Sequence, residues 1–286
     1  MQPIIIAEIG VNHNNDSNIL HDLVKGAATA QADFVKFQRF ISSEEISASA
    51  PLAEYQKEES SSYSSQLEMA QQLEMSDDLL LYCIELCKKY KIAPLCSAFE
   101  LKSLNYISTI LNMKSIKIPS PEITNIPFLC TAAKLFDDVI LSTGASSIAD
   151  IDNAISQLRD SNPMVNITLL HCVSEYPAPF SSLNLKAIQT MKSAFQLPVG
   201  FSDHSEGTFG AFAALSMGAC MLEKHITLDQ SLPGPDHKAS ATIDDLTEIC
   251  RFANLLPSMS GSGLKQVTNA EYKNKCLIRK SIYLNI

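Results

Sequence analysis

Short runs of apolar and β-branched residues alternate with amphipathic segments along most of the chain. The short runs predict eight β-strands, at residues 4–8, 34–38, 93–97, 115–120, 138–143, 167–173, 198–204 and 220–226. The other segments predict eight helices, at residues 18–30, 77–90, 101–111, 126–135, 148–159, 185–195, 208–216 and 243–254. Strands and helices that alternate in this number predict an α/β fold, a parallel (β/α)8 TIM barrel.

An open doubly wound sheet would also alternate strands and helices, but it needs a glycine-rich phosphate turn after its first strand. The segment that follows the first predicted strand, Gly10-Val-Asn-His-Asn, does not have the G-x-G-x-x-G spacing. The barrel is therefore the favoured architecture.

Two stretches interrupt the alternation. Residues 42–76 are rich in Ser, Glu and Gln and are predicted to form a long loop, either a lid or substrate wall at the catalytic end or solvated surface. After residue 254 the pattern weakens, and residues 270–279 are predicted to form a short charged helix and residues 281–286 the start of a strand. We therefore predict a single barrel domain over residues 1–256, with a C-terminal linker and short helix over residues 257–286.

The composition suits one large domain, with 286 residues of which 46% are hydrophobic. The formal net charge of −9 opposes nucleic-acid binding, so an anionic substrate would need a local cationic pocket. The N-terminus lacks the basic region of a signal peptide, and no apolar run approaches the roughly 18 residues that cross a bilayer. Several of the eight cysteines lie in or beside apolar runs, which favours reduced thiols in a cytoplasmic protein over a disulfide framework.

Polar groups collect at the ends of the predicted strands. In a (β/α)8 barrel the carboxyl ends of all strands meet in one pocket. A strand that only packed could end in any residue, whereas nearly every strand here ends in polar or reactive groups. The residues at these ends are Glu8, Lys36, Gln38, Ser97, Lys117, Ser120, Glu122, Ser142, Thr143, Ser174, Tyr176, Ser202, His204, Lys224 and His225.

Two lysines in this set can neutralise a phosphate group, because a lysine ammonium acts as a compact point charge and neighbouring hydroxyls can bind the remaining oxygens. The lysines are Lys36 and Lys117, and the hydroxyls are those of Ser97, Ser120, Ser142 and Ser202.

Two histidines, His204 and His225, end the last two strands and can offer nitrogen ligands to Mn²⁺, Mg²⁺ or Zn²⁺. Glu8 and Glu122 can act as general acid and base or bind substrate hydroxyls.

The sequence gives less reason to assign a catalytic or metal-binding role to the other four histidines. His21 is expected to be an exposed helix residue, and His171, inside an apolar run, a core histidine with a satisfied hydrogen bond. His13 and His237 lie in loops beside the predicted pocket, and the sequence leaves their roles open.

Eight motifs follow one another along the predicted barrel. They are Ala7-Glu-Ile-Gly-Val-Asn-His-Asn14, Val35-Lys-Phe-Gln38, Ile116-Lys-Ile-Pro-Ser-Pro-Glu122, Leu141-Ser-Thr-Gly144, Leu170-His-Cys-Val-Ser-Glu-Tyr-Pro177, Gly200-Phe-Ser-Asp-His204, Glu223-Lys-His225 and Pro233-Gly-Pro-Asp-His-Lys-Ala-Ser240. Together and in this order they are highly specific, and they resemble those of the sialic acid synthases, which make N-acetylneuraminate and relatives such as legionaminate.

The resemblance implies a metal-dependent enzyme that condenses phosphoenolpyruvate (PEP) with the open-chain aldehyde of N-acetylmannosamine or a related aminosugar. It implies that His204 and His225 hold Mn²⁺ or Mg²⁺, and that Glu8 and Glu122 are the catalytic carboxylates. The residues implied to bind PEP are Lys36, Ser97, Lys117, Ser120, Ser142 and Ser202, and those implied to bind the sugar are Gln38, Ser174, Tyr176 and Asp236.

The sequence departs from the family pattern at several points. Cys96-Ser-Ala-Phe99 keeps a hydroxyl at Ser97 but lacks the family's usual proline, Ser174 stands where some members have Asn, and Pro121 stands where glycine is usual and is expected to reposition Glu122. Family members usually continue into a small antifreeze-like domain that reaches across a homodimer and supplies an arginine to the partner's sugar site. This sequence ends where that domain would begin, so the domain is either lost or a separate polypeptide.

Three hypotheses follow. The first is an active, metal-dependent PEP–sugar condensing enzyme. The second is a barrel that keeps its ligands but has lost efficient turnover and serves as a binding or partner subunit. The third is a Schiff-base aldolase that uses Lys36 or Lys117 as its nucleophile.

Overall fold

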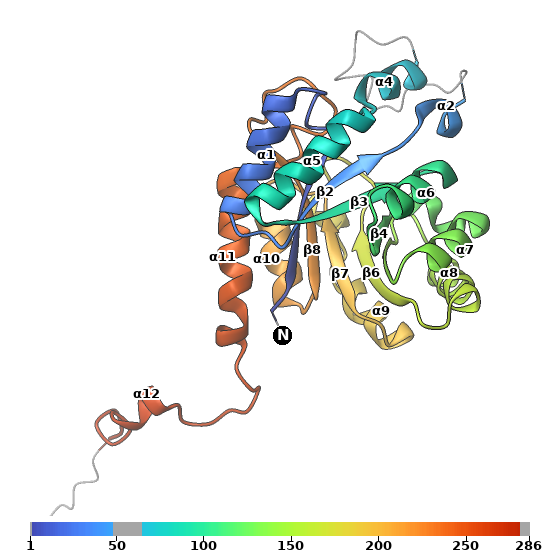
Figure 1. Cartoon of the computed structure of the whole chain (residues 1–286). Helices are drawn as coiled ribbons and strands as arrows, with labels where there is room; N and C mark the ends of the chain where they lie inside the picture. Colours follow the sequence, from blue (N-terminus) through green and yellow to red (C-terminus); the bar gives the residue numbers. More distant parts are fainter. Residues whose placement is uncertain (1, 48–64, 281–286) are drawn as a thin grey trace, which may run out of the picture.

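The computed structural model describes residues 2–47 and 65–280. Within them eight parallel strands close into a barrel, because β1 pairs with β2 on one side and with β8 on the other (Figure 1). This confirms the predicted (β/α)8 fold. The strands are β1 (Ile4–Gly10), β2 (Phe34–Arg39), β3 (Ala93–Ala98), β4 (Ser115–Ile118), β5 (Asp138–Ser142), β6 (Asn166–Cys172), β7 (Val199–Asp203) and β8 (Met221–Thr227), with a two-residue strand β9 (Ala241–Thr242) beside β8.

Helices pack around the outside of the barrel (Figure 1). Those that follow the strands are α1 (Ser17–Thr29), α5 (Asp77–Tyr90), α6 (Leu101–Thr109), α7 (Ile126–Leu135), α8 (Ile148–Ser161), α9 (Ala187–Phe195), α10 (Phe209–Ser216) and α11 (Ile243–Ser260). The shorter elements are α2 (Ser42–Glu45), α4 (Gln66–Leu73), α12 (Asn269–Tyr272) and the 3₁₀ helices η1 (Ser120–Thr124) and η2 (Phe180–Ser182).

The start of several helices is encoded locally. Asp16 accepts hydrogen bonds from the backbone N–H groups of Asn18 and Ile19 at the start of α1. Ser147 with Asp150, and Thr242 with Asp245, form reciprocal capping boxes at the starts of α8 and α11. Each cap satisfies backbone donors that have no partner inside the helix.

Alternation along the strands divides the apolar residues into two layers. Residues such as Val35 and Phe37 face outward and pack under the helices, in a core that surrounds the barrel. Ile6, Leu95 and Met221, with Ile140 and Leu170, face inward and form a separate apolar floor inside the barrel. A strand therefore places alternate residues in different environments, and this alternation decides which polar side chains reach the interior.

The prediction of a long loop over residues 42–76 is wrong for its described part. Helix α2 begins at Ser42, and helix α4 begins after Ser65, whose hydroxyl accepts from the backbone N–H of Glu68. The polar composition concealed the helical spacing of Leu67, Met69, Ala70 and Leu73, since the apolar face is narrow. Residues 48–64 lie outside the described residues.

Two boundaries near the C-terminus also differ from the prediction. Helix α11 runs to Ser260 instead of residue 254, with Pro257 inside it, and ends at Gly261, which has a φ of 63°. The helix predicted over residues 270–279 is a single turn, α12, followed by turns. The strand predicted over residues 281–286 lies outside the described residues.

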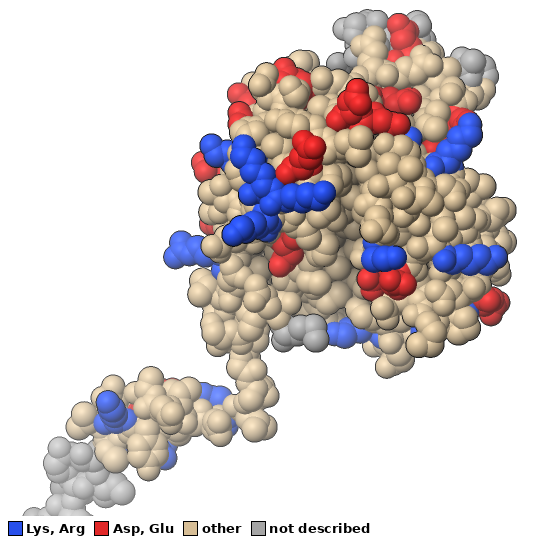
Figure 2. Space-filling view, viewed as in Figure 1, with Lys and Arg blue, Asp and Glu red and all other residues tan. Residues whose placement is uncertain are grey.

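On the face drawn in Figure 2, acidic and basic side chains lie near one another. No helix in the described part of the chain is long and apolar enough to cross a bilayer.

Candidate active site

Polar side chains lie directly above the apolar floor of the barrel. Two positions beyond Ile6, Leu95 and Met221 along their strands come Glu8, Ser97 and Glu223, which alternation places on the same inner face. Many of the predicted site residues line one cavity of about 380 Å³. They are Lys36, Gln38, Ser97, Lys117, Ser120, Ser142, Ser174, Tyr176, Ser202, His204, His225 and Asp236, and Glu223 joins them.

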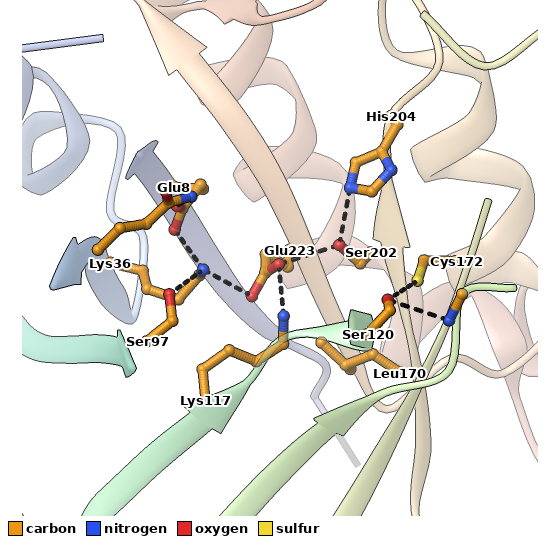
Figure 3. Close-up of polar contacts among 12 residues, drawn as sticks. Glu8, Lys36, Ser97, Lys117, Ser120, Leu170, Cys172, Ser202, His204 and Glu223 are labelled. Carbon is orange, nitrogen blue, oxygen red and sulfur yellow. Dashed lines mark hydrogen bonds and ion pairs between the residues drawn. The ribbon is translucent and has the colours of Figure 1, made fainter. Parts of the chain in front are cut away.

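Two buried lysines are joined by buried carboxylates at the bottom of this cavity (Figure 3). Lys117 Nζ lies 3.0 Å from Glu223 Oε1, and Lys36 Nζ lies 3.6 Å from Glu223 Oε2 and 2.7 Å from Glu8 Oε2. Gln38 donates a hydrogen bond of 2.9 Å to the other oxygen of Glu8. Glu223, on β8, therefore lies between two lysines that come from β2 and β4.

Burial and charge act in opposite senses on these groups. Burial alone would raise the pKa of the Glu223 carboxyl, but Lys117 and Lys36 hold that pKa well below its usual range. Burial raises the pKa of Glu8 despite the nearby Lys36. Burial lowers the pKa of Lys117, whereas for Lys36 the attraction of Glu223 and Glu8 outweighs burial and raises the pKa. The two carboxyls thus differ in their tendency to hold a proton.

Serine hydroxyls surround the lysines. Ser97 Oγ accepts a hydrogen bond of 3.1 Å from Lys36 Nζ, and Ser202 Oγ donates one of 2.9 Å to Glu223. Ser120 Oγ accepts one of 3.1 Å from the backbone N–H of Gly144. A side chain at Gly144 would collide with the hydroxyls of Ser174 and Ser120, so this position needs glycine. Serines from four different strand ends are therefore brought together with the lysines, as predicted.

The two histidines from the ends of β7 and β8 face each other in the same cavity. The ring centroids of His204 and His225 lie 6.0 Å apart. His204 Nδ1 lies 2.6 Å from the backbone oxygen of Val173, which can only accept, so Nδ1 carries the proton and Nε2 is the acceptor nitrogen. The hydroxyls of Tyr176 and Ser202 lie 3.1 Å and 3.3 Å from this Nε2. Burial lowers the pKa of His204 to about 3, with a further contribution from His225, and also lowers the pKa of His225. Both imidazoles are therefore neutral near pH 7.

These residues fit a divalent metal that keeps open coordination positions. A neutral imidazole with a fixed tautomer is the form that ligates metals, and an outer hydrogen bond such as that to Val173 is typical of metal-binding histidines. His225 Nδ1 is buried without a hydrogen-bond partner, and Asp236 Oδ2 lies 3.6 Å from it. Among the described residues no group of three or more His, Cys, Asp or Glu side chains has the geometry of a metal site. The donors at hand thus suit a metal completed by water or substrate oxygens.

The predicted sugar-binding residues lie at the same mouth. The ring of Tyr176 stacks on that of His204 with centroids 4.1 Å apart, and its hydroxyl lies 3.1 Å from His204 Nε2. Ser174 and Asp236 line the cavity as well.

Four of the predicted strand-end residues do not line this cavity. Glu8 is fully buried beside Lys36, and Thr143 lines a separate cavity together with His171. Glu122 is in η1, half-buried, where it accepts a hydrogen bond of 2.6 Å from Asn125, and it is not among the residues that line the cavity. Lys224 points to the outside of the barrel and pairs with Asp203 at 2.9 Å, so its assignment to the pocket is wrong. Lys224 neighbours His225 in a strand, and adjacent strand residues point to opposite faces.

Glu223 was not predicted to be a site residue, although it appears in the motif Glu223-Lys-His225. The alternation of side chains between the two faces of a strand could have identified it. If His225 faces the interior, then Glu223 must face it and Lys224 must not.

The remaining histidines have structural roles. His171 Nε2 lies 2.7 Å from the backbone oxygen of Leu183, which confirms the core assignment. His13 Nδ1 accepts from the backbone N–H of Asn15, and His237 Nδ1 lies 2.7 Å from Thr227 Oγ1. His21 was expected to be exposed but is half-buried on α1, where its Nε2 lies 2.8 Å from Tyr90 Oη. All eight cysteines are unpaired.

The protein is a closed (β/α)8 barrel with buried lysines, acids and imidazoles at the carboxyl ends of its strands. This arrangement is typical of the active sites of (β/α)8-barrel enzymes. The sequence profile of the NeuB family matches residues 23–265, and the chain belongs to that family. This confirms the predicted sialic acid synthase-like enzyme.

Similar proteins support this assignment. The chain is 44% identical to the N,N'-diacetyllegionaminic acid synthase of Campylobacter jejuni over 98% of its own length and 84% of that protein. It is 39% identical to the protein of the same name from Legionella pneumophila, over 99% of its length and 80% of that protein. Among solved structures, an N-acetylneuraminic acid synthetase from Leptospira borgpetersenii superposes with a TM-score of 0.83 at 32% identity, over 97% and 93% of the two chains. The homodimer and the separate antifreeze-like domain stay predictions.

Proposed function

We propose that this chain condenses PEP with the open-chain aldehyde of an acetamido sugar and releases a nonulosonic acid and phosphate. The observation that carries the proposal is the shared cavity, in which two buried lysines and a ring of serine hydroxyls lie beneath two neutral imidazoles. The names of the C. jejuni and L. pneumophila relatives favour a product of the diacetyllegionaminic acid type over N-acetylneuraminate.

The lysines would bind and orient PEP. Lys36 and Lys117 supply positive charge to its phosphate and carboxylate, while Ser97, Ser120 and Ser202 supply hydroxyl donors. All of these groups come from barrel strands or the residues directly after them, so they hold PEP in one orientation without a loop having to close.

The two carboxylates would serve different steps. Attack of PEP C3 on the aldehyde carbon leaves positive charge at PEP C2, which a permanently ionised Glu223 stabilises. Water then adds to C2 and loses a proton. We assign the transfer of that proton to Glu8, whose Oε2 lies 2.7 Å from Lys36 Nζ at the bottom of the cavity. The tetrahedral intermediate expels inorganic phosphate to give the keto acid. The predicted catalytic role of Glu122 is not needed in this scheme and stays a prediction.

His204 and His225 would hold the divalent metal, with Asp236 beside His225. When bound there, Mn²⁺ or Mg²⁺ supplies a Lewis acid for the aldehyde oxygen. Tyr176, stacked on His204, fixes the orientation of that imidazole.

The structure disfavours one alternative. A Schiff-base aldolase needs a neutral lysine, but Lys36 is paired with two carboxylates that raise its pKa. Only Lys117, whose pKa is lowered, retains that option, and it is paired with Glu223 at 3.0 Å.

One experiment separates the hypotheses. Phosphate release from PEP is measured with N-acetylmannosamine and with a diacetamido acceptor, each with Mn²⁺, with Mg²⁺ and with chelator. Metal-dependent release that requires the acceptor, with a product mass equal to that of the acceptor plus pyruvic acid, supports the proposal. PEP binding without release favours the weakened barrel, and chelator-resistant turnover with borohydride trapping of Lys117 favours the aldolase.

A further inference from the structure

The cavity has two chemically different sides. The barrel interior forms a polar side that carries the lysines, serines and histidines. The opposite side is apolar and is formed by Phe40, Ile46, Met69, Leu73 and Phe99, which follow β2 and β3 or belong to α4. Helix α4 lies in the segment that was predicted to form a long loop.

One face of α4 is directed into the cavity. Gln66, Met69, Ala70 and Leu73 all line it, and their spacing of three, four and seven residues places them on a single helical face. Gln71, on the other side of the helix, is exposed. Apart from Gln66 at the first turn, the face offers no hydrogen-bonding side chain to a bound molecule.

The end of α4 is fixed at both sides by hydrogen bonds. Asn15, in the loop after β1, donates to the backbone oxygens of Gln72 at 2.6 Å and Glu74 at 3.2 Å. The carboxylate of Glu74 accepts from the backbone N–H of Ser42 at 3.0 Å and from its hydroxyl at 2.8 Å. Ser42 is fully buried at the start of α2, which packs beside α4 beyond the end of β2 (Figure 1). The apolar face is thus held at a fixed place over the cavity.

We propose that α4 selects the sugar acceptor by packing against its methyl groups, an inference that rests on the proposed function. The aldehyde carbon must reach the polar side, where the histidines and PEP site lie, so the remote carbons of the acceptor extend toward α4. Acetamido and deoxy methyl groups bury favourably against Met69 and Leu73. Hydroxyl groups at the same place would lose water without gaining a hydrogen-bond partner. The substrate class is therefore an acceptor rich in methyl groups.

The test compares two acceptors that differ in methyl content, N-acetylmannosamine and 2,4-diacetamido-2,4,6-trideoxymannose, each with PEP and metal. The wild-type chain is expected to prefer the second by on the order of 10-fold in kcat/KM for each added methyl group it buries. Met69→Gln and Leu73→Gln are expected to reduce that preference by about 10-fold or more. Ala70→Leu, which fills space at the same face, is expected to raise KM for the larger acceptor above that for the smaller one.

Two internal controls accompany these variants. The KM for PEP should stay within about twofold in all of them, since the lysines and serines are untouched, and this reports intact folding of the site. Gln71→Ala, on the exposed side of the same helix, should leave the preference unchanged.

The outcomes separate the inference from the proposed function. Turnover with an acceptor preference that Met69→Gln and Leu73→Gln leave unchanged would overturn the role of α4 alone. Absence of phosphate release from PEP with either acceptor in the wild-type chain would overturn the proposed function and this inference with it.

Discussion

Lys224 and Asp203 form a buried ion pair on the outer face of the two strands whose inner face carries the histidine pair. Lys224 Nζ lies 2.9 Å from Asp203 Oδ2 and donates a second hydrogen bond of 2.7 Å to the backbone oxygen of Ser205. Asp203 precedes His204, and Lys224 precedes His225. The pair therefore ties together the ends of β7 and β8 directly behind the predicted metal ligands.

Breaking this ion pair should destabilise the fold and loosen the histidine pair. Lys224→Met leaves the carboxylate of Asp203 buried without its partner, which costs about 3–5 kcal/mol in the free energy of unfolding. The double variant Asp203→Asn, Lys224→Met should recover most of that loss, because the uncompensated charge is gone. Urea unfolding measures the stability, and Mn²⁺ binding followed by electron paramagnetic resonance should weaken in the single variant.

Lys25→Met, on the exposed side of α1, is the matched control and should change neither quantity. If Lys224→Met unfolds with the wild-type free energy, the pair does not hold the strand ends together.

Glu223→Gln is expected to separate binding from chemistry. The substitution keeps the hydrogen bond from Ser202 but removes the negative charge between Lys36 and Lys117. PEP should bind at least as tightly, since both lysines lose a competing anion, while kcat should fall by on the order of 100-fold because the cationic C2 is no longer stabilised. Calorimetric titration with PEP and phosphate-release kinetics test the two halves. Weaker PEP binding with an unchanged kcat would contradict the role given to Glu223.

The barrel itself could be predicted from the sequence, because eight apolar runs alternating with helices leave few other folds. Convergence of Lys36, Lys117, His204 and His225 followed from that fold alone, since strand ends meet at one mouth. The wrong assignment within the site arose where the direction of a side chain, and not only its position at a strand end, decides whether it reaches the pocket. Lys224 was placed in the pocket because its position at a strand end was considered without the alternation of strand faces.

Helix α4 could not be recognised for a different reason. The apolar face of this helix contains only four residues, and the helix lies in a polar segment. It is stabilised by hydrogen bonds to Asn15 and Ser42, which are distant in the sequence. Propensity in a short segment is too weak to reveal an element that depends on such tertiary contacts.

Stability should fall in mild acid because of buried neutral histidines such as His13. Burial lowers the pKa of His13 to about 4, below the unfolded value of about 6.5, so the unfolded chain binds a proton that the folded chain does not. The contribution of His13 to the free energy of unfolding is complete above pH 6.5 and is lost as the pH falls toward 4. At pH 5 the loss from His13 alone is about 2 kcal/mol.

His13→Asn offers a test of this pH dependence. An asparagine oxygen can replace His13 Nδ1 as acceptor for the backbone N–H of Asn15, but it does not titrate. The difference in unfolding free energy between pH 7 and pH 5 should therefore be smaller in the variant than in the wild-type chain, as measured by urea denaturation at both values. An equal difference in the two proteins would show that His13 is not one of the groups responsible.

His225→Phe should abolish metal binding without destabilising the metal-free fold. Buried His225 Nδ1 has no hydrogen-bond partner, so the metal-free protein carries a desolvated polar atom whose removal should raise the free energy of unfolding by about 1 kcal/mol or leave it unchanged. Mn²⁺ affinity should fall by on the order of 100-fold or more, because one of two imidazole ligands is lost. Lys25→Met on the exposed side of α1 again serves as the control for both measurements. Metal binding that survives His225→Phe would remove His225 from the site, whereas a large loss of metal-free stability would show that this imidazole is primarily a core residue.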